Sequence, residues 1–141
     1  MEENENQEIV LAQWQTCVEM ANSISQRRDS MNNLFVTLNL ALIAAISFLW
    51  DIKTIILSVA GIAVCFVWCR LIKNFKALNE EKFKVINAIE ERLPIQAFKD
   101  EWESIKQNKK YKDSTTIEYV LPIVFCVLYI AIIIYAAINC C

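Results

Sequence analysis

The chain has 141 residues, of which 56% are hydrophobic, 14 are basic and 16 are acidic. One glycine and two prolines provide too few turn residues for an all-β or α/β fold. Histidine is absent, which excludes imidazole-based catalytic triads, zinc–histidine centres and histidine pH switches. The net charge of −2 gives no indication of a nucleic-acid partner.

Three long apolar runs dominate the chain, at residues 34–50, 54–72 and 119–138, and Arg70 is the only charged side chain within them. A helix that crosses the hydrocarbon of a bilayer needs about 17–25 residues of this kind. The rest of the chain is too short to cover three buried helices on all sides. The sequence therefore predicts an all-α membrane protein with three transmembrane helices, whose outer faces contact membrane lipid.

The first two runs form a predicted transmembrane hairpin over residues 32–73, because only Asp51, Ile52 and Lys53 connect them. Every lysine and arginine other than Lys53 lies on the side of the hairpin opposite to that connection. Cytoplasmic segments carry such an excess of cations, so we expect the N-terminus inside the cell. The acidic N-terminal residues lack the apolar core of a signal peptide. Residues 117–141, the third span and a short tail, then end outside.

The two cytoplasmic segments, residues 1–31 and 74–116, are predicted to be amphipathic helices. In the first segment apolar residues recur at steps of three, four and seven, the spacing of a helix–helix seam: Val10, Trp14, Cys17, Ala21, Ile24 and Met31. In the second, the helix of the second span is expected to continue to Leu93. A returning helix is expected from Pro94 to about Gln107, because proline suits the first helical turn.

Both apolar stripes must be buried against another protein surface, and one small chain does not provide enough of it. Burial of a Phe or Leu side chain is worth roughly 1.5–3 kcal/mol, so several such residues favour association. The predicted contacts between subunits are Val10, Trp14, Phe75, Leu78, Phe83 and Trp102. We expect a homo-oligomer larger than a dimer. The alternative is that an unidentified protein partner buries the stripes.

A polar stripe runs along the first span and the residues before it. Arg28, Asn32 and Asn39 are separated by four and seven residues and so share one helix face. Polar side chains inside a bilayer face either a water-filled space or a polar partner. Two interpretations stay open. Either the stripe lines the axis or pore of an oligomer, with the first span at the axis and the third against lipid, or it forms hydrogen bonds between packed helices.

Small residues, namely Gly61, Cys65 and Cys69, recur at every fourth position of the second span. This spacing lets helices approach closely, and the lack of a nearby acid or histidine disfavours a metal or redox role for the two cysteines. The sequence contains no nucleophile–base pair, glycine-rich phosphate loop or metal-ligand spacing. We therefore expect no catalytic residues, no cofactor and no metal, and hence a protein that is not an enzyme.

Several short sequence segments are similar to those of a known protein family. They are residues 27–35 (RRDSMNNLF), 78–86 (LNEEKFKVI) and 90–94 (EERLP), together with Glu101 and Trp102. From about Gln26 to Trp102 the chain resembles the RipA family of small octameric bacterial membrane proteins. The resemblance implies a homo-oligomeric ring in the bacterial inner membrane with a cytoplasmic helical layer. It also implies a pore that the ring forms or gates, with a role in stress response or phage defence. The alternative is a non-conducting oligomeric scaffold that regulates envelope proteins.

The predicted topology places Cys140 and Cys141 outside the cell and Lys109, Lys110 and Lys112 inside it. An impermeant thiol reagent added to intact cells should therefore label the two terminal cysteines. Protection of both, with no disulfide to explain it, would reverse the assigned orientation.

Overall fold

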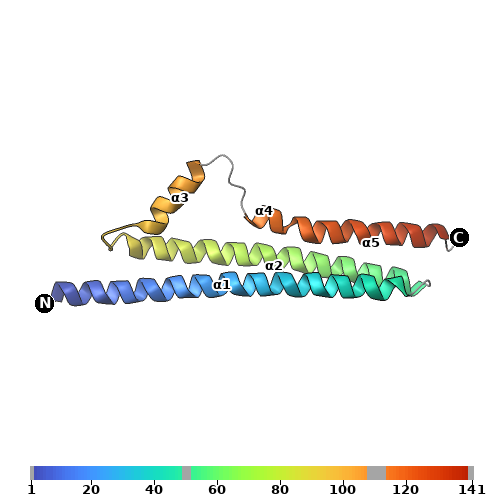
Figure 1. The fold of residues 1–141 in the computed structure, drawn as a ribbon, viewed down its shortest axis with the longest axis horizontal. Helices are drawn as coiled ribbons and strands as arrows, with labels where there is room; N and C mark the ends of the chain where they lie inside the picture. Colours follow the sequence, from blue (N-terminus) through green and yellow to red (C-terminus); the bar gives the residue numbers. More distant parts are fainter. Residues whose placement is uncertain (1, 49–51, 108–113, 140–141) are drawn as a thin grey trace. The chain divides into compact units, whose positions relative to one another are not determined.

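The structure is a computed structural model that describes residues 2–48, 52–107 and 114–139. This part of the chain is almost entirely helical and contains no strand. The helices are α1 (Glu2–Ser47), α2 (Ile52–Glu90), α3 (Ala97–Gln107), α4 (Ser114–Glu118) and α5 (Val120–Asn139), coloured in chain order in Figure 1. Trp50 and Asp51 of the predicted hairpin connection, Lys109, Lys110 and Lys112 of the loop, and the pair Cys140–Cys141 lie outside the described residues.

Three helical stretches are long and apolar enough to cross a membrane: Asn6–Ser47, Lys53–Glu90 and Thr115–Asn139. The prediction of an all-α membrane protein with three spanning helices is confirmed. The 46 residues of α1 and the 39 residues of α2, at about 1.5 Å per residue, exceed the roughly 30 Å thickness of the hydrocarbon. Each of these two helices therefore has a spanning part and a projecting part.

The chain divides into two units. The membrane unit comprises residues 28–74 and 113–141, and the polar unit comprises residues 1–27 and 75–112. The core of the membrane unit consists of Ile46, Cys65, Trp68, Ile72, Phe125 and Tyr129. Because these residues come from α1, α2 and α5, one core joins the three spanning helices, and Figure 1 shows α5 running beside α2.

Trp68 lies at the centre of the membrane unit and is fully buried. Its ring stacks on Phe35 of α1 with centroids 5.5 Å apart, and it lies tilted against Phe125 of α5 at 6.3 Å. Aromatic pairs at these separations stabilise a core beyond their buried area. On the outer faces large apolar side chains are exposed, among them Phe66 and Ile138 at 66% and 71%. Such faces suit contact with lipid.

A break at Tyr119 separates α4 from α5. Pro122, which is buried and is the third residue of α5, has no N–H and cannot donate a hydrogen bond to the carbonyl of Glu118. On either side of the break the amides of Tyr119 and Ile123 donate to the carbonyls of Thr115 and Tyr119, both at 3.3 Å. The proline therefore occupies the first turn of α5, and the short helix α4 precedes it.

The connection between α2 and α3 differs from the predicted one. We expected α2 to reach Leu93 and the next helix to begin at Pro94, but α2 ends at Glu90 and α3 begins at Ala97. Pro94 lies in the intervening bend. The physical reason is the buried carboxylate of Glu90, which accepts hydrogen bonds from the amides of Phe98 at 3.0 Å and Lys99 at 3.3 Å. A side chain from α2 thus caps the first turn of α3, where an anion is favourable.

Replacement of this cap should loosen α3. Glu90→Ala removes both acceptors from the first turn of α3, and loss of a helix cap costs about 1–2 kcal/mol. Hydrogen exchange at Phe98 and Lys99 should become about 5- to 30-fold faster. Glu91→Ala, which removes an equal charge from the exposed neighbouring position, is the control. Equal exchange rates in the two variants would show that Glu90 does not hold α3.

Candidate functional site

The polar side chains of the membrane unit form an interhelical network at three levels along α1. Arg28, Asn32 and Asn39 each extend from α1 to a different partner on another helix. Partnered polar groups are expected inside a bilayer, because hydrocarbon offers no hydrogen bonds. The network is the candidate site, and its three levels are built from different chemistry.

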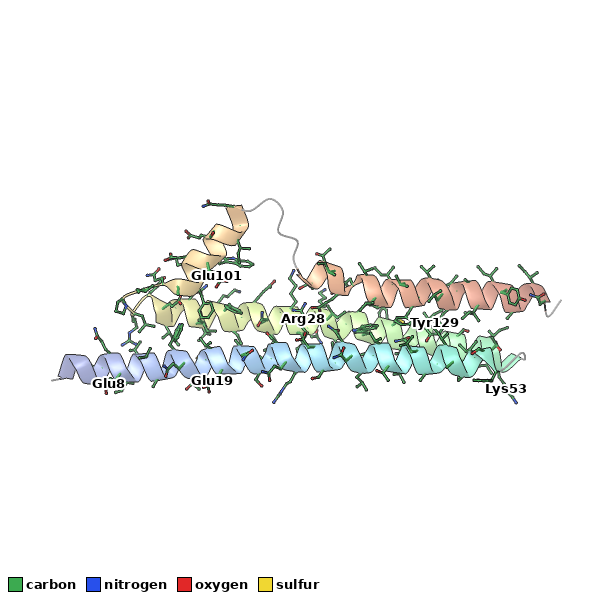
Figure 2. All side chains as sticks on the ribbon, in the orientation of Figure 1. Glu8, Glu19, Arg28, Lys53, Glu101 and Tyr129 are labelled. Atoms are coloured by element: carbon green, nitrogen blue, oxygen red, sulfur yellow. The ribbon has the colours of Figure 1, made fainter. Side chains whose placement is uncertain are left out.

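The first level is an ion pair between α1 and α4. Arg28 Nε donates to Glu118 Oε2 at 2.7 Å, and Arg28 Nη2 donates to Thr115 Oγ1 at 3.0 Å. The two charged side chains are only 14% and 17% exposed, and Figure 2 labels Arg28 in this position. A charge-assisted bond with this geometry is strong, and removal of one partner would leave a poorly solvated charge.

The second level fixes the central tryptophan. Trp68 Nε1 on α2 donates to Asn32 Oδ1 on α1 at 2.8 Å. A buried indole N–H normally finds a partner, and Asn32 provides it where Trp68 also stacks on Phe35. The hydrogen bond sets the orientation of the ring in the core, so Asn32 acts as a positioning residue for Trp68.

The third level lies deepest and centres on Asn39, which is fully buried. Its Oδ1 accepts a hydrogen bond from Tyr129 Oη of α5 at 3.0 Å and one from Cys65 Sγ of α2 at 3.4 Å. Its Nδ2 donates to the carbonyl of Phe35 at 2.7 Å. The amide therefore has partners on both its oxygen and its nitrogen, and one residue connects all three spans. Figure 2 labels Tyr129 on the face of α5 that meets the other helices.

Gly61 determines how closely α2 and α5 approach. A Cβ built at Gly61 would overlap the ring of Tyr129, so the absent side chain is what makes room for that ring. Cys65, one turn further along α2, is fully buried beside Asn39, and Cys69 is half-buried. The described residues contain no group of three potential metal-ligating side chains. Small side chains here serve the close packing of helices.

These contacts change the interpretation of the polar stripe. Arg28, Asn32 and Asn39 share one face of α1, but that face meets other helices of the same chain. The contacts within one chain are those of hydrogen bonding between packed helices, and the lining of an oligomer axis by these three residues stays a prediction. The structure also modifies the hypothesis that the third span only faces lipid, because Phe125 and Tyr129 of α5 are buried in the core.

The predicted contacts between subunits fall into two groups. Val10 is buried, Phe75 is half-buried, and Trp14 and Phe83 pack on Phe98 within one chain, with ring centroids 5.7 and 5.8 Å away. Leu78 and Trp102 remain 46% and 48% exposed. Phe98 of α3 therefore covers part of both stripes, and Leu78 and Trp102 stay open to a neighbouring molecule.

Sequence reasoning missed the partners of the stripe, namely Glu118, Thr115 and Tyr129. Each is about ninety residues away in sequence from its partner on α1. A signal existed for one of them, because a phenol in the middle of an apolar span requires a hydrogen-bond partner. Glu118 offered a weaker signal, as the last acidic residue before an uncharged run.

Gly61→Ala should destabilise the membrane unit, because the new methyl group meets the Tyr129 ring and overpacking costs about 1–3 kcal/mol. Ala60→Val, which adds bulk at the exposed neighbouring position, should have little effect. Thermal unfolding in detergent measures the difference. Replacement of Tyr129 by Leu should recover part of the loss caused by Gly61→Ala. Equal melting temperatures for Gly61→Ala and Ala60→Val would contradict the close approach.

Comparison with known proteins agrees with the membrane architecture. The family model of the octameric membrane protein family (8xMP) matches residues 11–138, a range that covers most of both units and of all three spans. No curated protein and no solved structure matches the chain. The narrower RipA assignment stays a prediction. Because the match covers nearly the whole sequence, the chain belongs to the octameric membrane protein family.

Proposed function

We propose that eight copies of the chain form a ring in the bacterial inner membrane and that the axis of this ring is a pore. Neighbouring helices pack about 8–10 Å apart, so eight of them in a closed circle lie roughly 10–13 Å from the axis. Subtraction of a helix radius of about 5–6 Å leaves an opening roughly 10–15 Å across. A single ring of eight helices therefore leaves a space that water, lipid or other protein segments must fill.

The observation that supports a water-filled axis is the composition of the outward face of α1. This α1 outer face lies opposite the buried stripe and consists of Ser30, Asn33, Thr37, Ala41 and Ala44, all of them exposed. Exposed leucines such as Leu34 and Leu40 flank this strip on α1, whereas the outer faces of α2 and α5 expose large apolar side chains such as Phe66 and Ile134. Small and polar residues suit a wide, weakly selective opening, whereas large apolar ones suit lipid. In this proposal the α1 outer face lines the axis.

The second candidate function is the non-conducting scaffold, and one observation favours it. The hydroxyl of Thr37 donates to the carbonyl of Asn33 at 2.9 Å, so Thr37 needs no water to satisfy its donor. Small residues such as Ala41 and Ala44 also let helices of neighbouring subunits approach closely. In that case the α1 outer face packs against the next subunit and the axis holds lipid.

The proposed topology, partners and lack of catalysis are those inferred from the amino-acid sequence. The N-terminus and the polar unit lie in the cytoplasm, and the C-terminus lies outside. The partners are other copies of the chain and membrane lipid, and the protein performs no catalysis. A role in stress response or phage defence rests on the resemblance to the RipA family alone.

Substituted cysteines distinguish the two functions. Thr37→Cys and Ala41→Cys place thiols on the α1 outer face, and Val59→Cys and Val127→Cys place them on exposed faces of α2 and α5 as controls. For a pore, a water-soluble thiol reagent should modify the first pair at least about tenfold faster than the second and block dye flux from liposomes. Labelling of the native cysteines is measured on the unmodified chain and subtracted. Equal slow labelling at all four positions, with no flux, would leave the scaffold as the function.

Assembly can be tested separately. Trp14→Ala and Phe83→Ala remove half-buried rings that pack on Phe98 within one chain. Loss of this packing should displace α3 and with it the exposed Trp102, a predicted contact between subunits. Native mass spectrometry in mild detergent should show both variants dissociating more than Lys109→Ala. A monomeric unmodified chain under the same conditions would contradict the octameric assembly.

A further inference from the structure

The polar unit contains a cavity between α2 and α3 that the proposed pore does not use. Its volume is about 370 Å³, within the range of about 300–1,000 Å³ that is typical of small-molecule sites. Its walls include Glu80 and Phe83 from α2, and Phe98, Glu101 and Trp102 from α3. Because Glu90 caps α3 and Phe98 packs on Phe83, both walls are held in place by contacts within the polar unit.

The lining has the chemistry of a site for a cation. Three aromatic rings and two carboxylates surround the space, and no lysine or arginine is among the residues that line it. The nearest cation paired with Glu80 is Lys76, whose Nζ lies 3.9 Å from Glu80 Oε1 in an exposed and therefore weak contact. Aromatic faces attract ammonium and guanidinium groups, and carboxylates accept their hydrogen bonds. The chain already shows this attraction, since Lys106 Nζ lies 5.5 Å from the centroid of the Trp102 ring.

Two amide side chains add unused acceptors. Asn79 and Asn87 each lie one turn from Phe83, on either side of it along the same face of α2, and also line the cavity. Their Oδ1 atoms are buried and accept no hydrogen bond within the described part of the chain. Buried acceptors without a partner are rare and often mark a missing molecule. Rotation of either carboxamide toward the cavity would give its oxygen a donor from a bound cation.

We infer that this cavity binds an alkylammonium or guanidinium group carried on an apolar stem. The aromatic rings receive the stem, and Glu80 and Glu101 pair with the charged head. Two sources offer this chemistry, a free polyamine-type cation and a lysine or arginine side chain of a neighbouring subunit. The inference concerns the polar unit and does not depend on what fills the axis of the ring.

The test uses the full-length assembly in detergent, with spermidine as the probe at constant ionic strength. Isothermal titration should show binding by the unmodified chain and a dissociation constant about tenfold higher in Glu80→Gln and Glu101→Gln. Glu103→Gln removes an equal charge from an exposed position of α3 outside the cavity and should change binding less than twofold. Circular dichroism checks that all three variants keep their helical content.

The results also identify the source of the cation. Binding that is lost only in the two cavity variants supports a free cation. Absence of spermidine binding, together with dissociation of the oligomer in Glu80→Gln and Glu101→Gln but not in Glu103→Gln, supports a side chain of a neighbouring subunit. Equal binding in all variants, or the absence of both binding and any variant-specific dissociation, overturns the inference.

Discussion

Water is absent from the hydrocarbon of a bilayer, so every polar group in a spanning helix needs a partner from the protein. Asn39 is the deepest such group on α1, and it is fully buried. Its amide accepts hydrogen bonds from Tyr129 and Cys65 and donates one to a carbonyl of its own helix. This requirement sets which face of each span points inward, because one satisfied amide fixes the rotation of α1, α2 and α5 together.

The outward faces follow from that inward arrangement. With Arg28, Asn32 and Asn39 bonded within one chain, the exposed surfaces of the three spans differ. Those of α2 and α5 are large and apolar, whereas α1 carries a strip of small and partly polar residues flanked by exposed leucines such as Leu34 and Leu40. Lipid suits the large apolar surfaces, and a water-filled axis or a neighbouring helix suits the strip of small residues on α1. Membership of an octameric family requires that some faces meet other copies, and the α1 outer face and the exposed Trp102 are the surfaces that differ from a lipid-facing one.

The spans were predictable because a long uncharged run has few alternatives to a transmembrane helix, and periodicity correctly grouped Arg28, Asn32 and Asn39 on one face. What that face meets was not predictable, since Glu118 and Tyr129 lie about ninety residues away from their partners and their contacts leave no local pattern. The start of α3 shows the same limit. Proline statistics placed it at Pro94, but a tertiary cap from Glu90 places it at Ala97.

A double-mutant cycle between Asn39 and Tyr129 tests most directly whether their hydrogen bond joins α1 and α5 within one chain. Asn39→Leu and Tyr129→Phe each remove one end of the bond between α1 and α5, and unfolding of the two single variants and the double variant in detergent gives their coupling energy. An intrasubunit hydrogen bond predicts a coupling of about 0.5–1.5 kcal/mol, with the Tyr129→Phe loss nearly absent once Asn39 is gone. If the losses of unfolding free energy in the two single variants are additive, with a coupling near zero, the intrasubunit bond is contradicted. The hypothesis that Asn39 faces the axis of the oligomer is then favoured.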